Sequence, residues 1–166
     1  FRSQRKVEVD FVTMTDYKLK RLPLRIAFPH KLIEPNLGSL VAEDGKRQLR
    51  VAESEKRAHV TYFFNGGRDE PYKGEERIIV PSKNVDAYDK VPEMSAKEIV
   101  EIVLKKAKSY DFVVANFANV DMIGHTGNIL AASKAIQTID TALEKITTAA
   151  FGWNGIVVIT ADHGNA

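Results

Sequence analysis

The stretch Tyr110–Phe117, with the sequence YDFVVANF, is apolar on both faces of an extended chain. This pattern is typical of a strand buried inside a parallel sheet. Gly155–Thr160 (GIVVIT) predicts a second buried strand, and Ile129–Ala150 predicts a long amphipathic helix between the two. The expected inner stripe of that helix is Ile129, Ala132, Ile136, Ile139, Leu143 and Ile146. We therefore predict an α/β fold, with a mostly parallel sheet covered by helices on both faces.

The preceding residues extend this pattern towards the N-terminus. Apolar runs predict strands at Gln48–Ala52, His59–Phe64 and Glu76–Val80, and a short helix at Leu37–Ala42. Ser95–Glu98 has the spacing of a capping box, which predicts the start of a further helix. Within the strand predicted at His59–Phe64, His59 is interpreted as a hydrogen-bonded residue of the core.

Composition excludes several classes of protein. The 166 residues are 44% apolar and 28% charged, which indicates a globular protein with a buried core rather than a disordered chain or a coiled coil. No apolar run is long enough to cross a membrane. The absence of cysteine excludes a disulfide scaffold and a thiolate metal site. We expect a cytoplasmic protein with no membrane partner.

Charge is unevenly distributed although the formal net charge is only +2. Residues 1–50 contain 11 Lys and Arg against 6 Asp and Glu, which suggests an anionic partner. The basic residues are spread among apolar ones with no run of five, so we predict a phosphorylated small molecule rather than nucleic acid. Pro29 and Pro35 interrupt regular structure and predict a hinge.

Two polar clusters follow the two buried strands. Asp121 and His125 come after the first strand, and Asp162 and His163 come after the second. Ligands gather at the carboxyl ends of strands in such sheets, and carboxylate and imidazole groups suit Mn²⁺, Zn²⁺ or Mg²⁺. A single pair of this kind is more often an exposed polar turn than a pair of metal ligands. Two pairs in equivalent positions favour a two-metal site of the kind used in phosphoryl transfer.

Five segments resemble cofactor-independent phosphoglycerate mutases, which are members of the alkaline phosphatase superfamily. They are Gln48–Gly67 (QLRVAESEKRAHVTYFFNGG), Pro81–Ser82, Val91–Ala96 (VPEMSA), Asn119–Gly127 (NVDMIGHTG) and Thr160–Ala166 (TADHGNA). The resemblance covers roughly residues 25–166. The superfamily shares the last two segments, whereas the first narrows the resemblance to the mutases.

The resemblance implies roles for five residues of the second part of the chain. Asp121 and His125 would be ligands of one metal, and Asp162 and His163 would be ligands of the other. Lys56 would contact the transferred phosphoryl group. The implied cofactors are two divalent ions, with Mn²⁺ preferred and Zn²⁺, Co²⁺ or Mg²⁺ as alternatives, and no 2,3-bisphosphoglycerate is needed.

The N-terminal residues resemble a substrate-binding motif of the same family. Phe1–Arg5 (FRSQR) is similar to the family's Phe-Arg-x-Asp-Arg, which implies that Arg2 and Arg5 bind the substrate, although Gln4 replaces the acidic residue. Residues 1–30 would then be the end of the phosphotransferase (substrate-binding) domain and the hinge, a remnant of a second α/β domain. Residues 31–166 would be an incomplete phosphatase-like, metal-binding domain.

The implied function is that of an isomerase of glycolysis and gluconeogenesis. It interconverts 3-phosphoglycerate and 2-phosphoglycerate through a metal-activated phosphoserine. No residue of this sequence matches the nucleophilic serine, so we expect a monomeric enzyme of which this chain is the C-terminal part, inactive as an isolated fragment. Two alternatives stay open. One is another phosphomutase or phosphatase of the superfamily, and the other is a non-catalytic fragment that only binds metal or phosphate.

Overall fold

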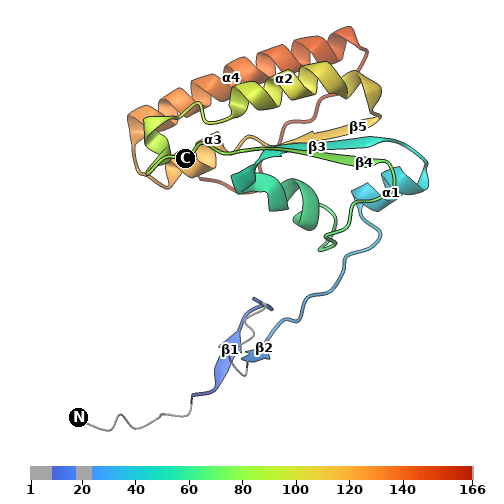
Figure 1. Cartoon of the computed structure of the whole chain (residues 1–166), viewed down its shortest axis with the longest axis vertical. Coiled ribbons are helices and arrows are strands. Elements are labelled where there is room, and N and C mark those ends of the chain that lie inside the picture. Colours follow the sequence, from blue (N-terminus) through green and yellow to red (C-terminus); the bar gives the residue numbers. More distant parts are fainter. Residues whose placement is uncertain (1–8, 18–23, 166) are drawn as a thin grey trace. The chain divides into compact units, whose positions relative to one another are not determined.

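Figure 1 shows the computed structural model, which describes residues 9–17 and 24–165. The chain forms two compact units, Phe1–Leu32 and Ile33–Ala166. In the first unit, β1 (Phe11–Thr13) and β2 (Leu24–Ile26) pair in parallel. The domain identities expected for residues 1–30 and 31–166 stay predictions.

The second unit is built on a parallel sheet of three strands. They are β3 (Gln48–Glu53), β4 (Glu75–Val80) and β5 (Phe112–Ala115), in the order β4-β3-β5. The central strand β3 is buried along its whole length, as expected for a strand with neighbours on both edges and helices on both faces.

Helices cover both faces of this sheet, as Figure 1 shows. On one face, α2 (Ala96–Lys106) lies beside α4 (Ile129–Gly152), and α4 also packs against the short helix α3 (Asn119–Gly124). The other face carries α1 (Leu37–Glu43) and the helical turns that follow β3. The predicted α/β class, with parallel strands covered by helices, is confirmed.

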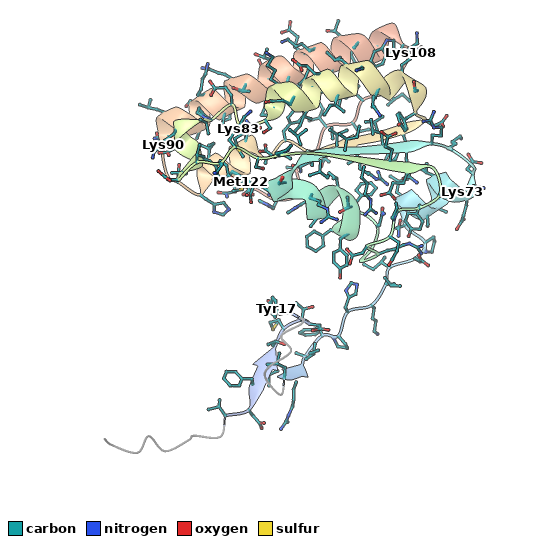
Figure 2. The ribbon with its side chains drawn as sticks, in the orientation of Figure 1. Tyr17, Lys73, Lys83, Lys90, Lys108 and Met122 are labelled. Atoms are coloured by element: carbon teal, nitrogen blue, oxygen red, sulfur yellow. The ribbon has the colours of Figure 1, made fainter. Side chains whose placement is uncertain are left out.

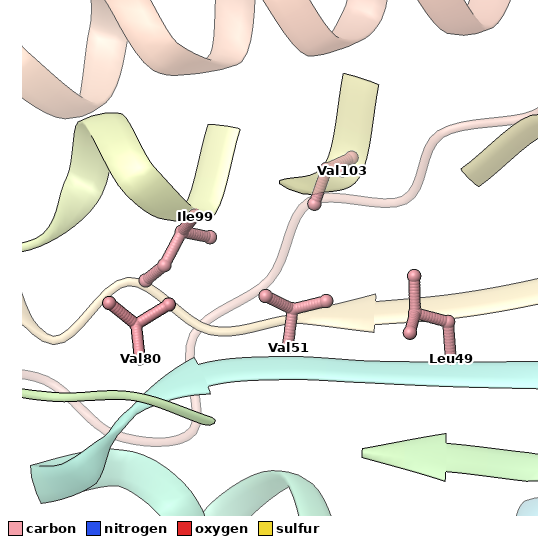
Figure 3. Close-up of a cluster of buried hydrophobic side chains, with 5 residues drawn as sticks. All are labelled: Leu49, Val51, Val80, Ile99 and Val103. Carbon is pink, nitrogen blue, oxygen red and sulfur yellow. The ribbon is translucent and has the colours of Figure 1, made fainter. Parts of the chain in front are cut away.

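The core lies between the sheet and α2. Charged side chains such as the labelled lysines of Figure 2 are exposed, whereas apolar ones fill the space above the strands. Figure 3 shows the central cluster, formed by Leu49, Val51, Val80, Ile99 and Val103. Its members come from two strands and one helix, so the cluster holds α2 against the sheet.

The strand predicted at His59–Phe64 is wrong. Residues 54–56 form a 3₁₀ turn and His59–Phe63 forms a short π-helix. The β-branched and aromatic residues of this segment favour a strand, but β3 and β4 run parallel and need a crossover between them. The segment is the beginning of that crossover, and the requirement of the topology overrides the local preference.

The strand predicted at Gly155–Thr160 is also absent from the described sheet. The segment has no regular secondary structure, and the side chain of Ile156 is 94% exposed. A strand forms only where a neighbour pairs with its backbone, and the described sheet ends at β5. Apolar composition alone therefore did not produce a strand here.

Two helix details differ from expectation. In α4 the buried residues are Ala131, Ala135 and Ala142, whereas Ile129 and Ile136 of the predicted stripe are exposed, because small side chains face the neighbouring helices. The predicted capping box is wrong too. Ser95 is the N-cap of α2, but its hydroxyl donates to the carbonyl oxygen of Pro81 at 3.0 Å instead of capping the helix.

Candidate metal and phosphoryl site

A buried lysine follows the end of the central strand β3. Lys56 lies in the 3₁₀ turn directly after β3, and its side chain is only 6% exposed. Its ammonium donates a hydrogen bond to Oδ2 of Asp121, which lies in α3 after β5. Because β3 and β5 are parallel neighbours, their following segments meet at the same edge of the sheet.

Asp121 is held from two sides. Lys56 contacts one carboxylate oxygen, and Nδ2 of Asn165 donates to the other, Oδ1, at 2.7 Å. Burial by itself would raise the pKa of Asp121, but the hydrogen bonds from Lys56 and Asn165 outweigh it and lower the pKa to about 2. The carboxylate is therefore ionised at neutral pH, the form in which it could bind a cation.

The predicted histidines gather around this carboxylate. His125 is the C-cap residue of α3, and its Nε2 lies 3.3 Å from Oδ1 of Asp121. Nε2 of His163 lies 3.8 Å from Oδ2 of Asp121 and 3.8 Å from Oδ2 of Asp162. The structure thus brings the two predicted acid–imidazole pairs together with Lys56, and His163 stands between the two carboxylates.

His59 is a further neighbour of the site, which the sequence pattern did not indicate. Its Nε2 lies 3.5 Å from Oδ2 of Asp162. Burial lowers the pKa of His59, and the nearby ammonium of Lys56 acts in the same direction. Helical backbone between positions 56 and 59 places residues three apart on one side, whereas the predicted strand hid this relation. Asn165 was part of the quoted motif but was assigned no role.

The chemistry of the donor atoms fits a hard or borderline divalent ion. Carboxylate oxygens and imidazole nitrogens converge without sulfur, and one carboxylate is ionised at neutral pH. Within residues 9–17 and 24–165, no group of three or more acidic or histidine side chains is arranged to hold a metal ion. The described residues therefore offer pairs of ligands rather than a finished coordination sphere.

Two further points concern substrate binding and membrane-spanning helices. Arg2 and Arg5 lie outside the described residues, so their predicted role in substrate binding stays a prediction. Among the helices that the structure describes, none combines the length and apolar character needed to cross a membrane.

Comparison with known proteins places this site in context. The model of the metalloenzyme superfamily matches residues 21–166. The 2,3-bisphosphoglycerate-independent phosphoglycerate mutase of Moorella thermoacetica is 45% identical over 161 residues, which cover 97% of this chain and 31% of that protein. The enzyme of the same name from Anaplasma phagocytophilum is 52% identical over 147 residues, 86% of this chain and 30% of that protein.

A solved structure agrees with the sequence matches. It is described as Leishmania mexicana phosphoglycerate mutase at low cobalt concentration, with a TM-score of 0.83 and 31% identity over 93% of this chain and 29% of that one. The resemblance predicted from the motifs is confirmed. The chain spans about 30% of the length of the curated relatives that it matches.

Proposed function

Because the chain belongs to the metalloenzyme superfamily, we propose that it supplies part of the active site of a 2,3-bisphosphoglycerate-independent phosphoglycerate mutase. The observation that carries this proposal is the meeting of the buried Lys56 with two acid–imidazole pairs at one edge of the parallel sheet. Superfamily membership implies divalent metal ions. The reaction proposed for the whole protein is the interconversion of 3-phosphoglycerate and 2-phosphoglycerate in glycolysis and gluconeogenesis, in the cytoplasm.

In this proposal the metal ligands are those indicated by the motifs. Asp121 and His125 would hold one ion, and Asp162 and His163 would hold the other, with Mn²⁺ preferred. When bound, such ions supply positive charge that stabilises phosphoryl oxygens and lowers the pKa of a hydroxyl nucleophile. The nucleophile would be a serine outside this chain, through which the phosphoryl group passes.

Lys56 would bind the transferred phosphoryl group. An ammonium has three N–H donors, so Lys56 can donate to a phosphoryl oxygen while it keeps its hydrogen bond to Asp121. Its burial strengthens this interaction because little water competes for the charge. Asp121 also fixes the direction of the lysine side chain, which would otherwise lose conformational freedom on binding.

The remaining parts of the proposal concern the substrate. Arg2 and Arg5 would bind phosphoglycerate from the substrate-binding domain, because a guanidinium can contact a phosphate or carboxylate with two parallel hydrogen bonds. Residues 31–166 would form the phosphatase-like domain, and the working protein would be a monomer that binds neither nucleic acid nor membranes.

The test is a mutase assay on the longest protein that contains this sequence, supplied with 3-phosphoglycerate and Mn²⁺ but no 2,3-bisphosphoglycerate. We expect 2-phosphoglycerate to form, and we expect the 166-residue chain alone to produce none. Asp121→Ala and Asp162→Ala should each abolish the metal-dependent turnover. Hydrolysis of generic phosphate monoesters that exceeds isomerisation would instead identify a phosphatase of the same superfamily.

A further inference from the structure

Asn165 connects the two motifs of the site. Its Nδ2 donates to Oδ1 of Asp121 at 2.7 Å and lies 3.3 Å from the backbone oxygen of the same residue. Both contacts join residues 44 positions apart in the sequence. One side-chain amide therefore fixes the carboxylate and the backbone of Asp121 from the segment that carries Asp162 and His163.

Gly124 makes room for this contact. A Cβ atom at position 124 would lie 2.9 Å from Oδ1 of Asn165, 3.2 Å from its Cγ and 3.2 Å from its backbone oxygen. The helix α3 that carries Asp121 is thus in close contact with the side-chain amide and the backbone oxygen of Asn165. The packing is independent of the hydrogen bonds and indicates the same docking of the two segments.

Lys56 and Asn165 contact different oxygens of the Asp121 carboxylate. The ammonium contacts Oδ2 and the amide contacts Oδ1, so the plane of the carboxylate is determined from both sides. We propose that Asn165 is a positioning residue, which orients Asp121 for a divalent ion and requires glycine at position 124 to do so. This inference rests on the metal site proposed above.

The contact itself is tested in the metal-free chain by NMR. The side-chain amide signal of Asn165 is assigned by its loss in Asn165→Leu, which keeps the volume but cannot donate. We expect this signal to shift in Asp121→Asn, while the signal of the exposed Asn84 stays in place. An Asn165 signal that does not respond to Asp121→Asn or to Lys56→Met would overturn the inference.

The consequence is tested by calorimetric titration with Mn²⁺ alone, with the same variants made in the longest protein that contains this sequence. Removal of a group that orients a metal ligand typically weakens metal affinity about 10-fold to 100-fold, which is the loss expected for Asn165→Leu. Gly124→Ala should weaken Mn²⁺ binding as well, whereas Gly152→Ala, which places a Cβ in open space, should not. In an Asn165→Ala background the added effect of Gly124→Ala should be smaller, because Oδ1 is gone.

The outcomes separate this inference from the proposed function. If Mn²⁺ affinity is unchanged by Asp121→Ala, or if the longest protein without substitutions binds no Mn²⁺, the metal site is refuted. The NMR result would still decide whether Asn165 orients Asp121. Affinity that falls in Asp121→Ala but not in Asn165→Leu would refute the positioning role. Asn165→Leu that lowers the urea midpoint without weakening Mn²⁺ binding would show a merely structural contact.

Discussion

Replacement of Lys56 by methionine isolates the electrostatic interaction at the centre of the site. The variant keeps an unbranched apolar side chain of similar length and removes only the ammonium. In the structure this ammonium contacts Asp121, and the two side chains are 6% and 16% exposed. The substitution therefore leaves a largely buried carboxylate without its cation.

The expected cost follows from the pKa of Asp121. Burial opposes ionisation, but the hydrogen bonds from Lys56 and Asn165 lower the pKa from 3.8 to about 2, and each pKa unit corresponds to about 1.4 kcal/mol. The interactions thus contribute about 2 kcal/mol at neutral pH. Breaking a buried pair by removing one partner costs about 3–5 kcal/mol, so we expect Lys56→Met to lose about 2–4 kcal/mol.

The pH dependence has a definite sign. The pKa of Asp121 is lower in the folded chain than in the unfolded chain, so its stabilisation is present above the unfolded value of 3.8 and is lost as the pH falls towards about 2. The difference in the free energy of unfolding between the two proteins should therefore be large near about pH 7 and shrink near about pH 3.

The assay is urea unfolding followed by circular dichroism, with a chelator present to exclude metal binding. Lys83→Met serves as the matched control. Lys83 pairs with Glu98 at 2.6 Å, but the two side chains are 42% and 41% exposed, and exposed pairs contribute about 0–1 kcal/mol. Equal losses of stability in the two variants at neutral pH, or a loss in Lys56→Met that is independent of pH, would refute the reasoning.

Three further comparisons test the fold by the same unfolding measurement. Ile99→Ala removes a fully buried core side chain and should cost about 2–5 kcal/mol, whereas Ile129→Ala, at an exposed position, should change stability by less than about 0.5 kcal/mol; similar costs would contradict the described core. Gly66 has φ +64°, and a Cβ there would lie 2.3 Å from the carbonyl oxygen of Ile33, so Gly66→Ala should destabilise more than Gly45→Ala, where φ is +70° but space is open. Burial raises the pKa of Glu53, so the native state loses stability as the pH rises through the interval between the unfolded and folded values. Glu53→Gln should therefore be more stable than the unmodified chain above neutral pH and similar to it near about pH 3, and the opposite order would show that the carboxylate is stabilised in its charged form.

Hydrophobic pattern predicts the central architecture of this chain well. The strands β3, β4 and β5 and the helices α1 and α4 form within a few residues of the predicted bounds. In each of these elements, apolar residues that form the pattern pack against a neighbouring strand or helix. The buried cluster of Leu49, Val51 and Ile99 is an example, because both strand and helix present apolar faces to one another.

The predictions fail where the structure of a segment depends on the segments that pair or pack with it, and not on its own sequence pattern. Residues 59–64 have strand-forming side chains but belong to a crossover between parallel strands. Residues 155–160 have the apolar pattern of a buried strand, yet the described sheet offers them no pairing. The predicted stripe of α4 is correct only in part. Ile146 packs against the core cluster, but Ile129 and Ile136 are exposed, and the fully buried positions of the helix are alanines.

The candidate site was likewise predictable only in part. Motif residues Asp121, His125, Asp162 and His163 were predicted from their places after apolar segments, and the structure brings them together. The contact of His59 with Asp162 depends on the helical backbone after Lys56, and the role of Asn165 depends on the approach of two distant segments. Neither relation is visible as a spacing in the sequence.

The central claim is that the two acid–imidazole pairs bind divalent ions beside Lys56. The most direct test is an anomalous difference map, recorded at the manganese absorption edge, from crystals of the longest protein that contains this sequence, equilibrated with Mn²⁺. We predict peaks at coordination distance from the carboxylates of Asp121 and Asp162, with His125 or His163 as a further ligand. A map in which Mn²⁺ binds elsewhere, or in which this edge of the sheet carries no peak, would contradict the claim.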